Sequence, residues 1–179
     1  MSFDSLIQLD QTLFIFLNAA LPRNIFFNYF FIFLTSIGYL GMIWIGIAVY
    51  LIVKNPKQHM HTTLKLITAN ILIVGIVELI LKNTVKRLRP EFTLYNINVL
   101  FDPVSTFSFP SGHATAAFAS AYILSKSFPK QKMIWYILAV LISFSRIYLG
   151  KHYPGDVIGG AVLGSVIGWG VMKIKIKNG

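Results

Sequence analysis

Long apolar runs, separated by short polar segments, make up most of the chain. They lie at residues 25–53, 64–81, 114–124, 134–144 and 157–172. Several of these runs approach or reach the ~17–25 residues that a helix needs to cross a bilayer. Only helices and closed barrels satisfy their backbone hydrogen bonds in lipid, and the alternating strands that a barrel needs are not visible. The pattern predicts an all-α, polytopic transmembrane helical bundle.

The first third of the chain is less regular than the rest. The segment Leu6–Leu21 is interrupted by polar residues, and it fits either a first span or a helix that lies in the membrane interface. Gly38 and Gly41 divide the apolar run that follows. This division predicts a short helix over Ile25–Ser36 and a span over Tyr39–Val53.

A polar stretch, Lys54–Thr63, follows that span and predicts a loop. It contains His59 and His61, and a pair of histidines can contribute to a metal site. Two ligands two residues apart, with no third ligand nearby, are a weak signal for metal. We interpret both as solvated loop histidines and expect no metal.

The composition supports a membrane protein. Of the 179 residues 55% are hydrophobic and 12% are charged, whereas a soluble domain carries about 25% charged residues. The formal net charge is +10, and the chain has no cysteine. A basic chain can bind nucleic acid, but these lysines gather in short loops between apolar runs, which is typical of contact with anionic lipid. We expect membrane lipids as partners and no nucleic acid.

Lysine clusters alternate along the chain with three segments that carry other polar chemistry. The clusters are Lys54/Lys57/Lys65, Lys126/Lys130/Lys132 and Lys173/Lys175/Lys177. By the positive-inside rule, such clusters face the cytoplasm. The segments at 82–89, 111–113 and 146–156 then share the opposite face of the membrane, which we expect to be extracytoplasmic.

The first of these segments combines basic residues with a proline. Glu78 and Lys82 are four residues apart, which fits either a structural ion pair or a carboxylate that orients the lysine. Lys82 and Arg89 are seven apart and nearly eclipsed on a helix, which Pro90 would end. Two cations on one face predict an anion site. The basic residues at 86–87 fit a cluster at a membrane edge.

The second segment reads Pro110-Ser111-Gly112-His113 and directly precedes a run of small residues at 114–121. Proline and serine before such a run mark a helix N-terminus. The free N–H groups and the positive dipole end of a helix N-terminus bind phosphate well. Glycine allows close backbone approach, and histidine can give or take a proton. The alternative is an ordinary helix cap followed by a histidine that has no functional role.

The third segment contains Arg146, His152 and Asp156. The guanidinium group of arginine suits a phosphate or a carboxylate. Histidine is a nucleophile, base or ligand near neutral pH. If this stretch is helical, Asp156 lies on the same face as His152 and can hold its imidazole in one tautomer. The alternative is a helix end with an incidental His–Asp pair.

Two further features concern packing and access. The polar and aromatic loop Glu91–Phe107 lies between two of the three segments and fits a lid or a substrate-contact surface. In the last apolar run, Gly160, Gly164 and Gly168 follow one another at intervals of four residues. Such small-xxx-small spacing predicts close packing of that helix against a neighbour.

Taken in order, the three motifs carry a family resemblance. They read Lys82-x6-Arg89-Pro90, Pro110-Ser111-Gly112-His113, and Ser145-Arg146-x5-His152-x3-Asp156. This arrangement resembles the signature of the type-2 phosphatidic acid phosphatase superfamily, and every signature position is filled. The resemblance covers the chain from about Lys82 to Asp156. It implies a helical bundle core, commonly of six spans, of which we count five plus an N-terminal segment.

The resemblance also implies a role for each site residue. His152 would be the nucleophile that forms a phosphohistidine, Asp156 would orient it, and His113 would be the general acid and base. Glu78 and Pro110 would contact the residues that bind the phosphate, without binding the phosphate themselves. The residues expected to bind the phosphate oxygens are Lys82, Arg89, Ser111, Gly112 and Arg146. The family is metal-independent, so no cofactor is expected.

These roles predict an integral membrane lipid phosphatase whose partner is a phosphorylated membrane lipid. We expect one membrane-embedded domain over 1–179, with N-terminal span or interfacial helices at about 6–36 and a catalytic core at about 64–172. The expected location is a bacterial inner membrane, with the site on the periplasmic side. The short chain and its first ~40 residues resemble lipid A 1-phosphatases and undecaprenyl pyrophosphate phosphatases, and the first is our preferred prediction. Phosphatidylglycerophosphate phosphatase is a further alternative, and the oligomeric state is open.

Two other functional classes share some of these features. Vanadate-dependent haloperoxidases have a similar site, but they are large soluble proteins, and the apolar spans argue against that class. A membrane transporter whose basic face binds anions is the non-enzymatic alternative. It would place charges along a path through the bundle, whereas here the charges gather at one end.

Overall fold

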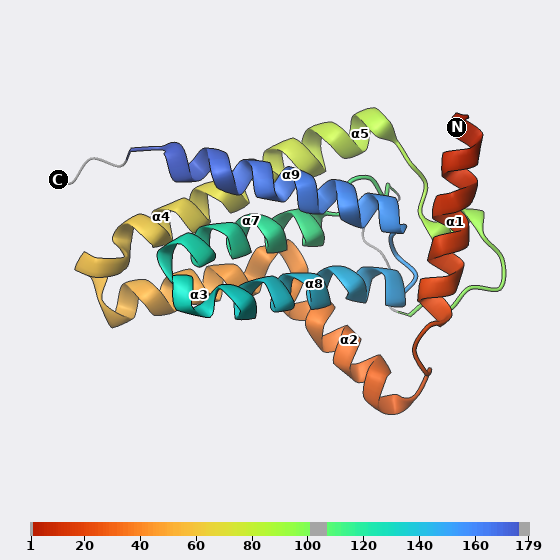
Figure 1. Cartoon of the computed structure of the whole chain (residues 1–179), viewed down its shortest axis with the longest axis horizontal. Coiled ribbons are helices and arrows are strands. Elements are labelled where there is room, and N and C mark those ends of the chain that lie inside the picture. Colours follow the sequence, from red (N-terminus) through yellow and green to blue (C-terminus); the bar gives the residue numbers. More distant parts are fainter. Residues whose placement is uncertain (1, 101–106, 176–179) are drawn as a thin grey trace.

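The computed structural model describes residues 2–100 and 107–175 as a bundle of helices with α7 at its centre (Figure 1). Long helices α3, α4, α8 and α9 surround α7, and α2 slopes away from the bundle. The helices are α1 (Phe3–Ala19), α2 (Ile25–Gly38), η1 (Tyr39–Gly41), α3 (Met42–Lys54), α4 (Pro56–Ile73), η2 (Val74–Leu81), α5 (Lys82–Val85), α6 (Pro90–Thr93), α7 (Gly112–Ser127), η3 (Pro129–Gln131), α8 (Lys132–Tyr148) and α9 (Pro154–Lys173). The prediction of an all-α membrane bundle is confirmed.

Three helical stretches are long and apolar enough to cross a membrane, among the residues that the structure describes. They are Ile25–Lys54, Pro56–Val85 and Pro154–Lys173. Helices α7 and α8 are shorter, with 16 and 17 residues. The number of five to six spans therefore stays a prediction.

The predicted loop over Lys54–Thr63 is wrong, because α4 already begins at Pro56. The side chain of Asn55 accepts a hydrogen bond from the Gln58 N–H at 3.2 Å, and proline occupies the first turn. Both features favour the start of a helix. His59 consequently lies on α4, where it is buried and its ring centroid is 5.6 Å from that of Phe128. It is a packing residue, not a solvated loop histidine.

The break near Gly38 is confirmed. Between α2 and α3, the short helix η1 contains Leu40 with φ of 46°, and Gly41 follows with φ of 73°. A Cβ atom on Gly41 would lie 2.1 Å from Oδ1 of Asn70. Glycine is therefore required both by the left-handed backbone and by the close approach of α4.

Helix α1 runs across the end of the bundle, at a steep angle to the long helices (Figure 1). Its Asn18 side chain donates hydrogen bonds to the carbonyls of Ile147 and Tyr148 at 2.9 and 3.0 Å, at the end of α8. The same side chain accepts one from the Asn98 N–H at 3.1 Å. A first span and an interfacial helix, the two alternatives that the sequence leaves open for Leu6–Leu21, both stay predictions.

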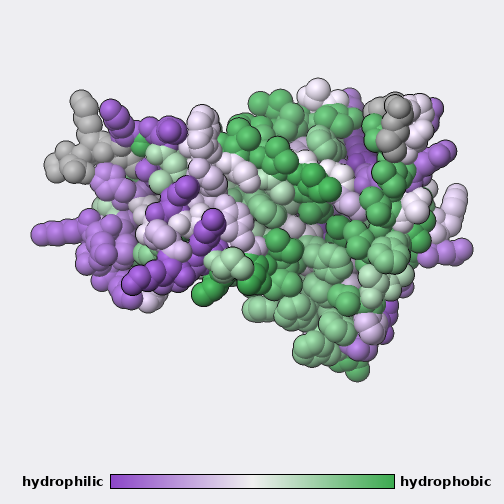
Figure 2. Space-filling model, in the orientation of Figure 1, coloured by the Kyte–Doolittle hydropathy of each residue, from purple (hydrophilic) through white to green (hydrophobic). Residues whose placement is uncertain are grey.

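The polar chemistry of the chain divides between the two ends of the bundle. The described lysines of the three clusters lie near the junction of α3 with α4, near the junction of α7 with α8, and at the end of α9, all toward one end in Figure 1; Lys177 lies outside the described residues. Figure 2 shows hydrophilic residues gathered at that end and a broad hydrophobic surface over the middle and α2. The first turns of α7 and α9 and the last turn of α8 lie at the opposite end.

Helix α9 packs closely on α7 through its glycines. A Cβ atom on Gly164 would lie 2.2 Å from the carbonyl oxygen of Thr115, and one on Gly160 would lie 2.6 Å from that of Ser111. Because backbone atoms cannot move aside as a flexible side chain can, these positions accept only hydrogen. The small-xxx-small prediction for this helix is confirmed.

We expect Gly164→Ala to destabilise the protein by about 1–3 kcal/mol, because the added methyl group overpacks the contact between α7 and α9. Thermal unfolding in detergent should show a Tm several degrees below that of the wild type. Gly170→Ala is the matched control on the same helix, since a Cβ atom there meets nothing within 4 Å. Equal Tm values for the two variants would contradict this account of the packing.

Candidate active site

A cavity of about 390 Å³ lies at the end of the bundle that carries the three motifs. Apolar residues of its wall come from η1, α3, α4, η2 and α7, while the motifs supply its cations and its two histidines. The predicted site residues that line it are Glu78, Lys82, Arg89, Gly112, His113, Arg146 and His152. The structure thus brings together residues from all three motifs.

His152 precedes α9, so it does not share a helix face with Asp156 as the spacing predicted. Residues 152–153 have no regular structure, and Asp156 lies in the first turn of α9. Its Oδ2 accepts a hydrogen bond from the Tyr153 N–H at 2.8 Å and lies 3.6 Å from His152 Nδ1. The pair meets because a helix cap aims the carboxylate back at the preceding loop. The predicted neighbourhood is correct, but the helical reason for it is wrong.

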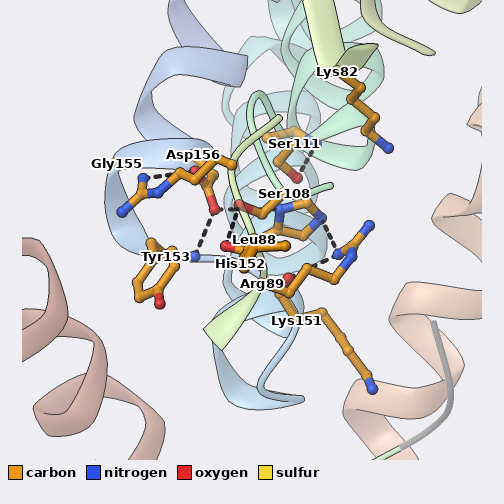
Figure 3. A network of polar contacts seen from close by, with 12 residues as sticks. Lys82, Leu88, Arg89, Ser108, Ser111, Lys151, His152, Tyr153, Gly155 and Asp156 are labelled. Carbon is orange, nitrogen blue, oxygen red and sulfur yellow. Dashed lines mark hydrogen bonds and ion pairs between the residues drawn. The ribbon is translucent and has the colours of Figure 1, made fainter. Parts of the chain in front are cut away.

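The imidazole of His152 is almost fully buried, with 2% of the residue exposed. Figure 3 shows the ring between Arg89 on one side and Asp156 on the other. Arg89 Nη1 lies 3.1 Å from Nε2. Because arginine only donates hydrogen bonds, this contact makes Nε2 an acceptor and leaves the ring proton on Nδ1, beside the carboxylate. Nε2 is therefore the unprotonated nitrogen.

Burial lowers the pKa of His152 well below its ordinary value, and the nearby charges of Arg89, Arg146 and Lys82 lower it further. Both causes disfavour the imidazolium form. At neutral pH the ring is neutral, so the lone pair on Nε2 is available.

The first motif does not form one helix, so Lys82 and Arg89 are not eclipsed on a helix face. Helix α5 ends at Val85, and Lys86 adopts a left-handed conformation with φ of 52°. Pro90 begins the short helix α6 and does not end the preceding helix. Lys82 and Arg89 both reach the cavity because the chain turns back on itself between them.

Glu78 and Lys82 form an ion pair on the wall of the cavity. Lys82 Nζ lies 2.9 and 2.8 Å from the two carboxylate oxygens. Glu78 belongs to η2, a π-helical stretch of eight residues, and Lys82 follows directly after it. Wide helical turns of this type are frequent at functional sites. The predicted proximity of the two residues is confirmed.

The second motif begins α7. Ser111 is its N-cap, and its Oγ accepts a hydrogen bond from the Ala114 N–H at 3.5 Å. Gly112 lines the cavity, and a Cβ atom there would lie 2.6 Å from Oε1 of Glu78. Pro110 and Ser111 are buried and do not line the cavity, so Ser111 caps the helix and Pro110 lies behind it.

Thr35 of α2 is a site residue that the sequence did not reveal. Its carbonyl oxygen lies 3.1 Å from Nε2 of His113, and its hydroxyl accepts a hydrogen bond from Nη1 of Arg146. One residue thus joins the second and third motifs. Nothing in the apolar run around Thr35 distinguishes it from a packing threonine.

The loop Glu91–Phe107 is only partly described, and residues 101–106 of the predicted lid lie outside the described part. Among the rest, Glu91 accepts a hydrogen bond from Nζ of buried Lys151 at 2.6 Å. Leu100 donates its N–H to the carbonyl of Leu149 at 3.2 Å. The described residues of this loop do not line the cavity.

Comparison with known proteins gives a consistent picture. A family model described as the PAP2 superfamily matches residues 62–179. An undecaprenyl-diphosphatase from Sulfolobus acidocaldarius is 34% identical over 138 residues, which are 76% of this chain but 64% of that protein, less than two thirds of its length. The crystal structure of Aquifex aeolicus LpxE matches with a TM-score of 0.74 and 31% identity, over 93% of this chain and 96% of that one. The crystal structure of a transmembrane PAP2 type phosphatidylglycerolphosphate phosphatase from Bacillus subtilis matches with a TM-score of 0.66 and 29% identity, over 94% of this chain and 85% of that one.

We expect His152 to stay neutral as the pH falls through 6.5, the ordinary pKa of histidine, because burial and three cations oppose its protonation. NMR of protein labelled with ¹³C in its four histidines would follow this titration. The spectrum of His152→Asn identifies the His152 signal. A titration midpoint at or above 6.5 would contradict the assigned environment.

Proposed function

We propose that this chain, which belongs to the PAP2 superfamily, is a membrane phosphatase that hydrolyses a lipid phosphate through a phosphohistidine. The observation that carries the proposal is the position of His152. Its ring is buried at the wall of the cavity, with Nε2 beside Arg89 and Nδ1 beside Asp156. A nucleophile with an orienting group on its far side is the arrangement that covalent catalysis needs.

In the proposed reaction, His152 Nε2 attacks the phosphorus atom as the bond from phosphorus to the lipid oxygen breaks. His113 gives a proton to the leaving oxygen, and the lipid departs. A water molecule then attacks the phosphohistidine, His113 takes a proton from that water, and inorganic phosphate is released. Asp156 stabilises the imidazolium form that His152 acquires when its Nε2 is bonded to phosphorus.

The protein's own cations stabilise the charge on the transferred phosphoryl group. Lys82, Arg89 and Arg146 line the cavity, and each is less than a tenth exposed. Nε of Arg146 is buried and has no hydrogen-bond partner among the described residues. Phosphoryl transfer depends on such positioning and charge neutralisation. The Gly112 backbone at the start of α7 offers further N–H donors.

The charge of the cavity favours a phosphate monoester. Three cations and one carboxylate, Glu78, line it, so the charges of these four groups sum to +2, before the proton that His113 gives in the reaction is counted. A phosphate monoester carries about −1.5 to −2 near neutral pH, whereas a lipid diphosphate carries more negative charge. Together with the sequence resemblance, this supports the 1-phosphate of lipid A as first choice. Undecaprenyl pyrophosphate and phosphatidylglycerophosphate are the alternatives.

The apolar wall of the cavity supports a lipid substrate. Tyr39, Leu40 and Met42 line it and are 42%, 54% and 51% exposed. A head group can occupy the polar end while its chains remain in the bilayer beside these residues. Because Thr35 of the N-terminal part contacts His113 and Arg146, we also propose that residues 1–179 form one functional unit around the core at 64–172.

The detergent-purified protein should release phosphate from lipid A in the presence of EDTA, and His152→Ala should abolish the release. The panel also contains undecaprenyl pyrophosphate, phosphatidylglycerophosphate and phosphatidate. Removing a nucleophile leaves no path to the covalent intermediate. Release that survives in His152→Ala, or no release from any lipid, would contradict the proposal and favour an anion-binding protein. A preference for another lipid of the panel would overturn only the choice of head group.

We also propose that the site faces the extracytoplasmic side of a bacterial inner membrane, opposite the lysine clusters. The chain has no cysteine, so single cysteines report topology directly. In intact cells, Tyr95→Cys should react with a membrane-impermeant maleimide, because Tyr95 lies at the site end and is 93% exposed. Lys57→Cys, at the opposite end, should react only after lysis. The reverse pattern would place the site in the cytoplasm.

A further inference from the structure

The carboxylate of Asp156 is fully buried and has a cation as its partner. Arg87 Nη1 donates to Asp156 Oδ1 at 2.8 Å, while Oδ2 faces Tyr153 N–H and His152. The two oxygens therefore have separate tasks. Oδ1 is held by Arg87, and Oδ2 is directed at the imidazole.

Arg87 is itself held on two further sides. Its Nη2 donates to Oδ2 of Asp10 at 2.7 Å, and its guanidinium carbon lies 4.1 Å from the centre of the Tyr153 ring. The carbonyl oxygen of Arg87 accepts a hydrogen bond from the Ser108 N–H at 2.7 Å. A planar guanidinium group between two carboxylates fixes their relative positions, which a single ammonium group cannot do in the same way.

Asp10 belongs to α1 and contacts α9 as well as Arg87. Its Oδ1 accepts a hydrogen bond from the Gly155 N–H at 2.8 Å, one residue before Asp156. Eight residues further along α1, Asn18 is bound to the last turn of α8. Helix α1 is therefore fixed at two places, and its carboxylate reaches the turn that carries Asp156.

We propose that Arg87 is a positioning residue that holds Asp156 against His152, and that Asp10 of α1 holds Arg87 in turn. The inference rests on the proposed phosphohistidine mechanism. Arg87 occupies one of the unspecified positions of the first motif and does not line the cavity, so it acts on the reaction only through Asp156. By this account helix α1 is one of the elements that orient the proposed nucleophile.

Removal of Arg87 would leave a buried carboxylate without its cation, which such a group does not tolerate in its original position. The remaining partners of Asp156 would be the Tyr153 N–H, the Ser108 side chain and a neutral imidazole. The carboxylate would then move or take up a proton, and Nδ1 of His152 would lose the negative charge that faces it. The phosphate-binding cations Lys82, Arg89 and Arg146 would be unaffected.

We expect Arg87→Ala in the full-length protein to lower kcat for phosphate release about 10–100-fold, by analogy with the loss found when the hydrogen-bond partners of metal ligands are removed. KM should change little, because the cations that bind the phosphate remain. Millimolar guanidinium should restore much of the lost kcat, since the Arg87 side chain is 25% exposed and its site can be reached from solvent. Urea, which has the same shape without the charge, should not restore it.

The matched control is Lys86→Gln, which removes the exposed neighbouring cation and should leave kcat unchanged. Asp10→Asn should lower kcat less than Arg87→Ala, because the amide oxygen can still accept from the Gly155 N–H. The double variant should be no worse than Arg87→Ala alone, since Asp10 acts through Arg87.

A spectroscopic readout separates this inference from the proposed function. In the wild type the ¹³C shifts of His152 should report a proton fixed on Nδ1, and in Arg87→Ala a mixture of tautomers that guanidinium reverses. This test needs no turnover, so it decides the positioning role even if no lipid of the panel is hydrolysed. An unchanged His152 signal, or a loss of kcat that follows a lower Tm and that guanidinium does not restore, would overturn the role of Arg87.

Discussion

The burial of three cations around one cavity is the constraint on which the rest of the structure depends. Lys82, Arg89 and Arg146 are 6%, 3% and 8% exposed, and Glu78 is the one carboxylate among the described residues that line the cavity. Cations buried together repel one another and lack water. An anion with several oxygen acceptors relieves both costs, so the same arrangement that opposes folding of the empty site favours binding of a phosphate.

The bundle supplies the rigidity that such a site needs. Helix α7 starts at the cavity, and α9 packs on it closely enough that only glycine fits at Gly160 and Gly164. The Ser111 N–H donates to the carbonyl oxygen of Asp156 at 3.1 Å, so the beginnings of the two helices are directly bonded. This backbone hydrogen bond fixes the distance between the second and third motifs, and no side chain takes part in it.

Most of the predicted site residues line one cavity, whereas the predicted backbone of two of the three motifs was wrong. The motifs could be placed at one end because each adjoins the end of an apolar run. The helical register inferred for Lys82 and Arg89 was wrong, since a left-handed residue at Lys86 turns the chain between them. The contact of His152 with Asp156 arises from a helix cap, which spacing alone does not distinguish from a helix face. Arg87 was interpreted as part of a membrane-edge cluster, because its partner Asp10 lies 77 residues away and pairs of that separation leave no local pattern.

The N-terminal helices and the rest of the chain contribute different contacts to the site. The family model begins at residue 62, so neither Asp10 nor Thr35 lies in the matched region. Yet Thr35 joins His113 to Arg146, and Asp10 joins Arg87 to the first turn of α9. The matched region thus contains every group that would touch the phosphate, while two of the contacts that fix those groups come from α1 and α2. Changes in these two helices can alter the positions of Asp156, His113 and Arg146 without altering any motif.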